Sequence, residues 1–313
     1  MNNTETFLEE NVIKIVPKRT RFGKQKGDTI INVMITTLLV ILAVVAMFPF
    51  YNVLVLSFAS VKGMAEHSIY LLPYTFDLTS YGKLFKETSF YRAFGVSVFV
   101  TAMGVALNMF LSVTGAYALS KKGMPGRNIL LSLVLFTMFF SGGLIPFYLV
   151  VKSVNLVNNI LVMVIPTGVT TMYLIIMKNY FNTIPASIEE SAKVDGANDM
   201  YILLKIVLPI SKPFIATFAL FYAVDRWNEW YNALIFISDS AKIPLQIYLR
   251  GLLINMSVQL SSSAAAVVDS KAGVGIQATQ MASIVISAIP IMCIYPFMQK
   301  HFARGIMVGS IKE

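Results

Sequence analysis

The sequence is poor in the residue types that most catalytic and metal sites use. It contains one cysteine, Cys293, and two histidines, His67 and His301, far apart in the chain. A single cysteine excludes an intramolecular disulfide, and we expect Cys293 to be a buried structural thiol because it lies within an apolar run. Two distant histidines cannot form a metal centre, so the sequence predicts no metal site.

Charge is also scarce. Only 13% of the 313 residues are charged and 56% are hydrophobic, whereas a soluble domain has about 25% charged residues. This deficit predicts a membrane protein. A transmembrane helix needs roughly 20 mostly apolar residues, and six runs satisfy that length: Ile30–Ala59, Ala93–Leu119, Ile129–Val151, Ile160–Tyr180, Phe214–Ile237 and Ala278–Met298.

These runs predict an all-α, polytopic membrane protein, because backbone groups in hydrocarbon must bond within helices. We expect residues 1–28 to be a cytoplasmic tail and 29–313 the transmembrane domain. The segments on the side of the termini (1–28, 120–128, 178–213 and 299–313) hold 16 Lys and Arg, against 8 in the opposite segments 60–92, 152–159 and 238–277. This bias predicts that both termini lie in the cytoplasm. The basic tail suits anionic lipid, and nucleic-acid binding is not expected, because the basic residues form no continuous face.

A charged stretch, SIEESAKVDGAN at 187–198, interrupts the fourth and fifth apolar runs. Pro185 suits the first turn of a helix, and Ser187 with Glu190 has the spacing of a capping box, so a helix can start at either point. Gly196 is expected to break it, and a second helical run is predicted from Asn198 to Val207, ended by Pro209 and Pro213. Physical reasoning alone leaves two interpretations open, a surface linker and a docking segment.

The spacing of this stretch resembles the cytoplasmic signature of ABC importer permeases. Glu190-Ser191-Ala192 is followed after three residues by Gly196, and after nine more by Ile206-Val207-Leu208-Pro209, with serine in place of the usual first alanine. In that family the segment is the coupling helix, which docks on a cytoplasmic ATPase subunit. The resemblance implies that Gly196 makes the bend and small residues permit close approach, while Glu190 and Asp195 fix orientation. The implied coupling residues are Glu189, Glu190, Ser191, Ala192, Asp195, Gly196 and Ala197.

The resemblance covers nearly the whole chain. It includes Ala116–Ser120 with Pro125–Arg127, the stretch Ser141–Pro146, and the tail Tyr295–Phe302. The last two resemble a branch associated with complex or uronate-containing oligosaccharides. The resemblance implies a type I importer permease fold, a second permease subunit, two ATPase subunits and an external solute-binding protein. The sequence has no Gly-rich P-loop, so ATP and Mg²⁺ are expected on the partner ATPases, and no cofactor or enzyme site on this chain.

A polar cluster within the fifth run is the candidate substrate path. Its residues are Asp225, Arg226, Trp227, Asn228, Glu229, Trp230 and Tyr231. Charges at membrane depth cost about 2.5–3.5 kcal/mol each on insertion scales, so they must face protein or water. Asp225 and Glu229 are expected on one helical face, and Arg226 can pair with Glu229. The cluster is either an internal ion-pair staple or an aromatic-lined part of a sugar path.

Segment 238–277 is expected to be a long external loop, flexible around Ser261–Ala266, that either approaches the binding protein or is a simple linker. Two other function classes stay open. An ion-coupled secondary transporter could use the intramembrane carboxylates as a proton relay. A membrane-embedded enzyme would need a catalytic pair, and Asp225 and Glu229 are the only carboxylates of the fifth run.

Overall fold

The computed structural model describes residues 26–60, 76–263 and 270–305. The contacts within the chain divide it into two units, Met1–Asn52 and Val53–Glu313. Among the described residues the secondary structure is helical, and the one β-type pairing is an isolated antiparallel bridge between Ala59 and Phe76. The prediction of an all-α protein is confirmed.

The described part of the first unit is a single apolar helix. Helix α2 runs from Lys26 to Ser57 and contains Pro49, so the first predicted span is confirmed as one continuous helix, and its last five residues belong to the second unit. From Ile31 to Phe50 its apolar side chains are exposed, with Met34 at 69% and Phe50 at 74%, whereas Val55 and Leu56 near its end are buried. An all-round apolar helix of this kind needs lipid or another subunit around it.

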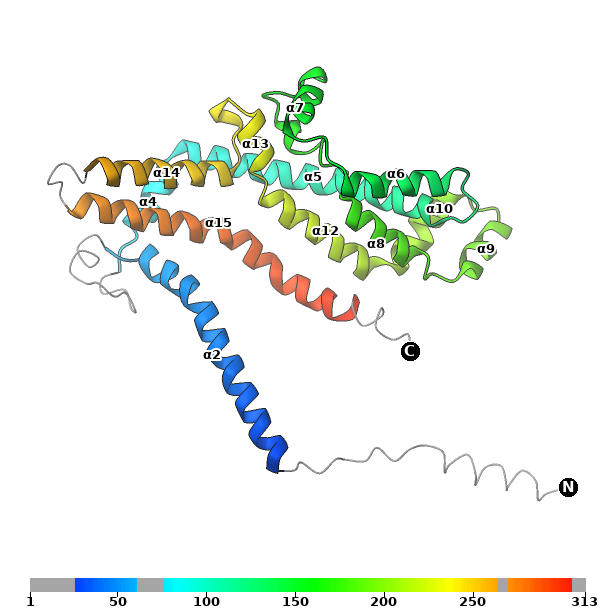
Figure 1. Cartoon of the computed structure of the whole chain (residues 1–313), viewed down its shortest axis with the longest axis horizontal. Coiled ribbons are helices and arrows are strands. Elements are labelled where there is room, and N and C mark those ends of the chain that lie inside the picture. The colour runs from blue at the N-terminus through cyan, green and yellow to red at the C-terminus, as the bar shows by residue number, and fades with distance from the viewer. Residues whose placement is uncertain (1–25, 61–75, 264–269, 306–313) are drawn as a thin grey trace. The chain divides into compact units, whose positions relative to one another are not determined.

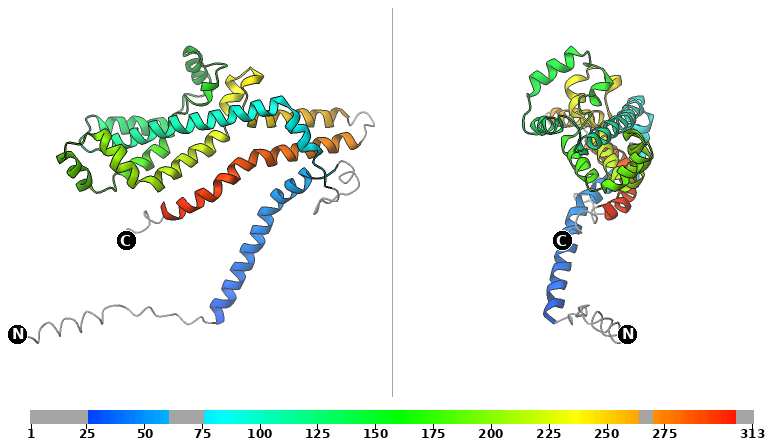
Figure 2. Two further views of the ribbon diagram at one scale, coloured as in Figure 1. Left: turned by 180° about the vertical axis from the view of Figure 1, so that it is seen from behind. Right: turned by 90° about the vertical axis from the view of Figure 1, so that its right-hand side faces the viewer.

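The second unit is a bundle around α5, which runs from Thr88 to Ser120. Helices α8 (Thr171–Phe181) and α12 (Lys212–Trp227) pack along α5. Helix α15 (Ser270–Gly305) packs against α12, against the short α4 (Thr79–Lys86) and against α14 (Leu245–Ser263). Helix α9 (Ala186–Val194) and helix α14 lie at opposite ends of this bundle (Figures 1 and 2).

The predicted third and fourth spans are not continuous helices. The third consists of α6 (Arg127–Phe139) and α7 (Leu144–Ser153), which are bent by 120°. Gly143, with φ +83°, lies at that bend, in a backbone region that only glycine adopts cheaply. The fourth consists of the 3₁₀ turn η2 (Ile160–Met163), a non-helical stretch and α8. A count of apolar residues does not detect such breaks.

The predicted fifth span is also broken. Helix α12 ends at Trp227, and α13 (Tyr231–Phe236) begins after three residues. In the described part of the chain, three helices are long and apolar enough to cross a membrane alone, or up to five spans if each bent pair counts as one. Several apolar helices suited to a membrane are therefore present, whereas the predicted number of six is not confirmed.

The predicted external loop is largely helical where the structure describes it, which corrects the expectation of a loop. It contains the 3₁₀ turn η4 (Ser240–Lys242), then α14 through Ser263, and α15 starts at Ser270. The rest of the Ser261–Ala266 stretch, like residues 1–25, lies outside the described residues. Cys293 is exposed on the surface of α15, so the expectation of a buried thiol is wrong for the isolated chain.

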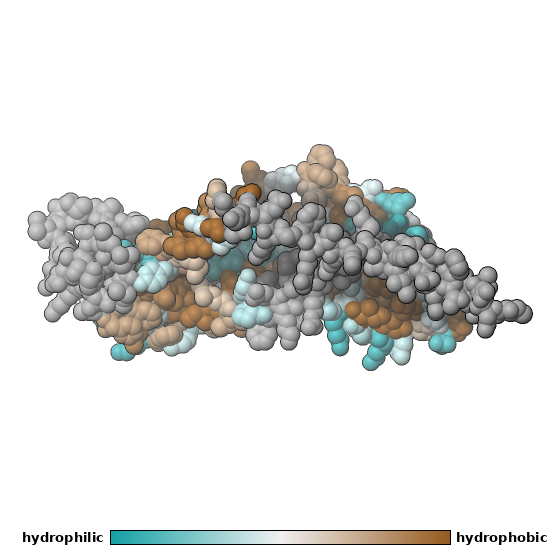
Figure 3. Space-filling view, turned by 90° about the horizontal axis from the view of Figure 1, so that it is seen from below, coloured by the Kyte–Doolittle hydropathy of each residue, from teal (hydrophilic) through white to brown (hydrophobic). Residues whose placement is uncertain are grey.

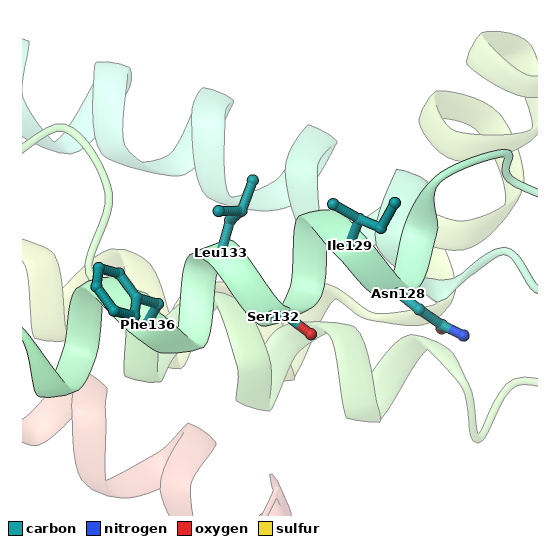
Figure 4. A pocket seen from close by; sticks show the side chains of 5 residues that line it. All are labelled: Asn128, Ile129, Ser132, Leu133 and Phe136. Carbon is teal, nitrogen blue, oxygen red and sulfur yellow. The ribbon is translucent and has the colours of Figure 1, made fainter.

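Exposed apolar side chains cover much of the molecule. Figure 3 shows hydrophobic residues along the visible described surface, with hydrophilic residues toward the end that carries α9 in Figure 1. Helix α6 has no buried residue along its length, all of which is described. A shallow hollow of about 430 Å³ lies on it, lined by Asn128, Ile129, Ser132, Leu133 and Phe136. In Figure 4, Ile129 and Leu133 point to one side of α6, and Asn128 and Ser132 to the other.

Candidate functional site

The first candidate site is the helical segment between α8 and α12. Helix α9 begins at Ala186 with Pro185 as its N-cap, so the start predicted at Pro185 describes it better than the capping box at Ser187. The predicted break at Gly196 is confirmed: α9 ends at Val194, and Gly196 has φ +82°. The side chain of Asn198 then accepts from the backbone N–H of Tyr201 at 2.8 Å and caps the next helix.

The second helical run is longer than predicted. Helix α10 (Asp199–Ile202) continues into a π-helical turn, η3 (Leu203–Val207), and then into α11 (Leu208–Ile210). Pro209 therefore does not end the run: it lies at the start of α11, directly after the π-helical turn. The chain turns by 90° only after Ile210, at the start of α12.

The inner face of α9 is anchored to the bundle. Ala192 is buried in an apolar cluster with Tyr117 of α5 and Phe181 of α8. Its carbonyl accepts from the backbone N–H of Ala197 at 3.0 Å, which closes the bend around Gly196. In this chain the small side chain of Ala192 therefore permits close packing within the subunit, whereas sequence reasoning assigned it to the approach of a partner.

An ion pair holds the start of α9. Lys121, directly after α5, pairs with Glu189, and their side chains are 27% and 15% exposed. The Lys121 ammonium also lies 3.9 Å from the centre of the Tyr117 ring, a favourable cation–π geometry. Glu189 thus points toward its own chain. Sequence reasoning missed Lys121, and its position just after the second apolar run was the only available signal.

The outer face of the bend is exposed and of mixed character. Glu190, Ser191, Asp195 and Gly196 are all exposed, and Val194 is 87% exposed. Beside it lies a hollow of about 560 Å³, lined by Ala192, Asp195, Gly196, Ala197, Asn198, Tyr201, Lys205 and Ile206. An exposed apolar tip next to a hollow is suited to contact with another protein.

A surface ion pair spans the same bend. Lys193 of α9 lies 2.9 Å from Asp199 of α10. The hydrogen bond from Lys193 to Asp199, with the negative charge of that carboxylate, raises the pKa of Lys193 above its ordinary value. The pair is well exposed and its net contribution to stability is small, but it links the two helices on either side of Gly196.

The second candidate site is the break between α12 and α13. Four of the seven predicted path residues are exposed there: Asp225, Asn228, Trp230 and Tyr231. Arg226 and Trp227 are buried instead, and the Trp227 indole N–H donates to the carbonyl of Ser287 on α15 at 3.1 Å. Glu229 accepts from the backbone and side chain of Asn232 at 3.0 and 3.2 Å.

The expectation that Asp225 and Glu229 share a helical face is wrong, because α12 ends at Trp227 before Glu229 is reached. The two carboxylates have separate partners. Asp225 accepts from the hydroxyl of Tyr173 on α8 at 3.2 Å. A carboxylate oxygen of Glu229 lies 3.9 Å from a guanidinium nitrogen of Arg226. The predicted ion pair is therefore present, at a long distance.

Arg226 bonds mainly to the end of the 3₁₀ turn η2 and to the non-helical stretch between η2 and α8. Its guanidinium donates to the carbonyl of Met163 at 2.8 Å and to the carbonyl and hydroxyl of Thr167. It also donates to the side chain of Asn108 on α5 at 2.9 Å. The Asn108 amide donates in turn to the carbonyls of Thr167 and Gly168, each at 2.8 Å. These backbone carbonyls thereby receive hydrogen bonds from side chains of the protein. A non-helical segment inside a bilayer needs such bonds, because no water is available there.

Helix α14 adds two side chains that sequence reasoning missed. Gln246 donates to the side-chain carbonyl of Asn228 at 3.4 Å, and the guanidinium of Arg250 lies 5.2 Å from the centre of the Trp230 ring. Both come from the segment predicted to be a loop, so only their four-residue spacing could have signalled a shared helical face. Among the described residues, no group of three His, Cys, Asp or Glu could hold a metal ion.

Comparison with known proteins identifies the family. The polygalacturonan/rhamnogalacturonan transport system permease protein YtcP of Bacillus subtilis is 44% identical over 289 residues, which cover 91% of this chain and 99% of that protein. The chain belongs to the ABC importer permease family. Protein LplC of the same organism is 43% identical to this permease over 270 residues, 86% of this chain and 90% of LplC. No family model matches the chain.

A solved structure has the same fold as this permease. It is a crystal structure of a bacterial ABC transporter involved in the import of the acidic polysaccharide alginate, with a TM-score of 0.80 and 33% identity, covering 90% of this chain and 99% of the other. A relative at lower identity is the arabinooligosaccharides transport system permease protein AraQ of Halalkalibacterium halodurans, 26% identical over 92% of this chain and 99% of AraQ. The resemblance inferred from the sequence motifs is therefore confirmed, and the chain is a membrane permease of the carbohydrate branch.

Proposed function

We propose that this permease is the membrane subunit of an ATP-driven importer for acidic, uronate-containing oligosaccharides. The observation that carries this proposal is the 44% identity to YtcP over almost its full length, a permease named for polygalacturonan and rhamnogalacturonan transport. The alginate importer, 33% identical and similar in structure, supports the same substrate class. Both are systems for polymers that carry a carboxylate on the sugar ring.

The outer face of the bend in segment 181–212 is proposed as the docking surface for a partner ATPase. Val194, Asp195 and Gly196 form its exposed tip, and the neighbouring hollow offers room for a partner side chain. Glu190 and Asp195 are available to orient the contact, while Ala192 and Glu189 hold the helix to α5 and α8. Motion of α9 would pass into the bundle through that inner face.

The remaining partners follow from the same family. We propose a second, homologous permease subunit, two ATPase subunits that bind ATP and Mg²⁺, and an external solute-binding protein, while this chain binds no cofactor. Both termini and segment 181–212 are proposed to be cytoplasmic, supported by the excess of Lys and Arg on that side. Helix α14 is then external, and its place at the end of the bundle opposite α9 supports this orientation (Figure 1).

The exposed residues of the α12–α13 break are proposed to line the sugar path. Asp225 and Asn228 offer hydrogen-bonding groups, and Trp230 and Tyr231 offer apolar ring faces. Arg226, Trp227 and Glu229 are proposed to hold the break in shape, because their bonds point into the protein. Alternating access would expose this break to the outside when ATP closes the ATPases and to the cytoplasm after hydrolysis.

The test is uptake of labelled oligogalacturonate by cells that make the intact importer, compared with cells lacking this chain. We expect uptake to require the chain, to be blocked by vanadate, and to survive an uncoupler that collapses the proton gradient. Uptake that vanadate spares and the uncoupler abolishes would establish an ion-coupled secondary transporter instead. Uptake of neutral oligosaccharides alone would refute the acidic substrate class while retaining the transporter class.

The docking surface has its own test. Replacing Val194 by Asp places a charge on an exposed tip, so the fold of the chain should be unaffected. We expect the ATPase subunits to be lost when the tagged permease is purified from membranes. Retention of the ATPases at the wild-type ratio would contradict the proposed docking surface.

A further inference from the structure

The surface between α14 and the α12–α13 break brings together four polar or aromatic side chains from two elements. Asn228 and Trp230 lie two residues apart in the break, and Gln246 and Arg250 lie one helical turn apart on α14. Gln246 bonds to Asn228 at 3.4 Å and Arg250 lies against Trp230 at 5.2 Å. The two contacts place an amide pair next to a cation–aromatic pair.

Within the described part of the chain, Arg250 has no carboxylate partner. The ion pairs among the described residues are Lys121–Glu189, Lys193–Asp199, Arg226–Glu229 and Lys242–Asp239, and Arg250 takes part in none of them. The carboxylates of the nearby break are already engaged, Asp225 by Tyr173 and Glu229 by Asn232 and Arg226. Arg250 is exposed, and Trp230 is 44% exposed.

The chemistry of this group matches one ligand class. A guanidinium that rests on an aromatic ring keeps its N–H groups at its edge, and that planar fork binds a carboxylate through two parallel hydrogen bonds. The exposed part of the Trp230 ring offers an apolar face to a sugar ring, and amides of the Asn and Gln type bond hydroxyl groups. A uronate residue can bind all three kinds of group: its carboxylate binds the guanidinium, its ring lies on the Trp230 face, and its hydroxyl groups bond to the amides. A neutral sugar has no anionic group for the guanidinium.

We propose that Arg250, Trp230, Asn228 and Gln246 form a subsite that binds one uronate residue of the incoming oligosaccharide and selects for acidic sugars. The inference rests on the proposed function, because it places the acidic substrate in this permease. It goes further by assigning selectivity to α14, a helix outside the predicted path cluster. The positive charge of Arg250 binds the carboxylate, and Trp230 both holds the guanidinium and contacts the ring.

The competing occupant of an exposed arginine in a membrane protein is an anionic lipid headgroup. Trp230 alone does not distinguish the two, since aromatic residues also lie at membrane interfaces. The amide pair favours the sugar, because Asn228 and Gln246 add hydroxyl-binding groups that a lipid phosphate does not need. The lipid is therefore a separate outcome of the experiment.

The experiment uses the whole importer in proteoliposomes and compares Arg250→Gln with wild type for ATP-dependent uptake of oligogalacturonate and of a neutral arabino-oligosaccharide of equal length. We expect Arg250→Gln to lower kcat/KM for the acidic sugar by about tenfold or more, because a charge-assisted bond is lost, and to leave the neutral sugar within twofold. Arg250→Lys should recover part of the loss, since it restores the charge without the fork. Arg92→Gln, at an exposed arginine of α5, is the matched control.

The outcomes separate the inference from the function on which it rests. If the wild-type importer takes up no acidic sugar, the proposed function fails. If it does and Arg250→Gln leaves both uptakes unchanged or lowers them equally, the subsite is wrong. If vesicles without anionic lipid reproduce the Arg250→Gln defect in the wild type, Arg250 binds lipid and the subsite is also wrong.

Discussion

Arg226 and Asn108 lie 2.9 Å apart, are both buried, and both donate to the carbonyl of Thr167. One comes from α12 and the other from α5, and together they hold the non-helical stretch before α8. A buried arginine at membrane depth is costly unless all its donors are engaged. Its bonds to the Met163 and Thr167 carbonyls fulfil that requirement better than the 3.9 Å contact with Glu229.

Replacing Arg226 by Gln should destabilise the permease by roughly 2–3 kcal/mol, because buried carbonyls lose their donors while bonds inside membranes have only moderate net strength. Arg226→Lys should not restore stability, since an ammonium cannot reach several carbonyls as the planar fork does. The measurement is the free energy of unfolding from an SDS titration of the permease in bicelles.

The neighbouring substitution Asp225→Asn is the matched control for Arg226. Asp225 is exposed, and asparagine can still accept from Tyr173, so we expect a change within about 0.5 kcal/mol. Equal destabilisation by the two substitutions would show that charge anywhere in this cluster matters, and the specific network around Thr167 would then not explain the stability.

Gly104 of α5 leaves the room that the Arg226 side chain occupies. A Cβ at Gly104 would lie 2.6 Å from Cδ and 2.8 Å from Cγ of Arg226, and the bonds at the guanidinium prevent that chain from moving away. We expect Gly104→Ala to destabilise by about 1–3 kcal/mol through overpacking. Gly95→Ala on the same helix meets nothing within 4 Å and should stabilise by up to about 1 kcal/mol. The same SDS titration compares the two, and a neutral Gly104→Ala would contradict the tight packing.

The broken spans show what the sequence could predict of the fold and what it could not. Apolar length and low charge were enough for an all-α membrane protein, because burial in lipid depends on composition. The 120° bend between α6 and α7 and the stretch before α8 depend on tertiary bonds such as those of Asn108 to Thr167 and Gly168. A polar residue in an apolar run gives no sign of which distant carbonyl it will satisfy.

In the candidate sites, too, local features could be predicted from the sequence, whereas features that depend on tertiary contacts could not. The bend at Gly196 was predictable because a glycine among charged residues is a local signal. The inward direction of Ala192 and Glu189 was not, because it depends on Tyr117, Phe181 and Lys121 from other elements. Arg250 and Gln246 were missed for a similar reason, since their contacts are with Trp230 and Asn228 of an element distant in the sequence.

We expect any side chain at Gly196 to weaken the coupling between the ATPase subunits and transport. Its φ of +82° costs a residue with a Cβ about 1–3 kcal/mol, although the space around it is open within 4 Å. We expect Gly196→Ala to reduce both ATPase co-purification and uptake, with Gly196→Asn intermediate because asparagine enters this region more easily. Gly82→Ala in α4, also in open space, is the control, and equal effects at the two glycines would count against a role for the bend.

We expect the Lys121–Glu189 ion pair to couple movement of α9 to movement of α5. Lys121→Glu and Glu189→Lys each place like charges together at the start of α9, so we expect each to lower the uptake obtained per ATP hydrolysed. The double exchange restores opposite charges and should recover most of that ratio, with a coupling energy of about 0.5–1 kcal/mol for a partly exposed pair. The measurement is ATP hydrolysis and uptake on the same proteoliposomes. If the double variant is as defective as the sum of the single ones, the pair does not transmit the motion, and the buried contacts of Ala192 with Tyr117 and Phe181 must carry it instead.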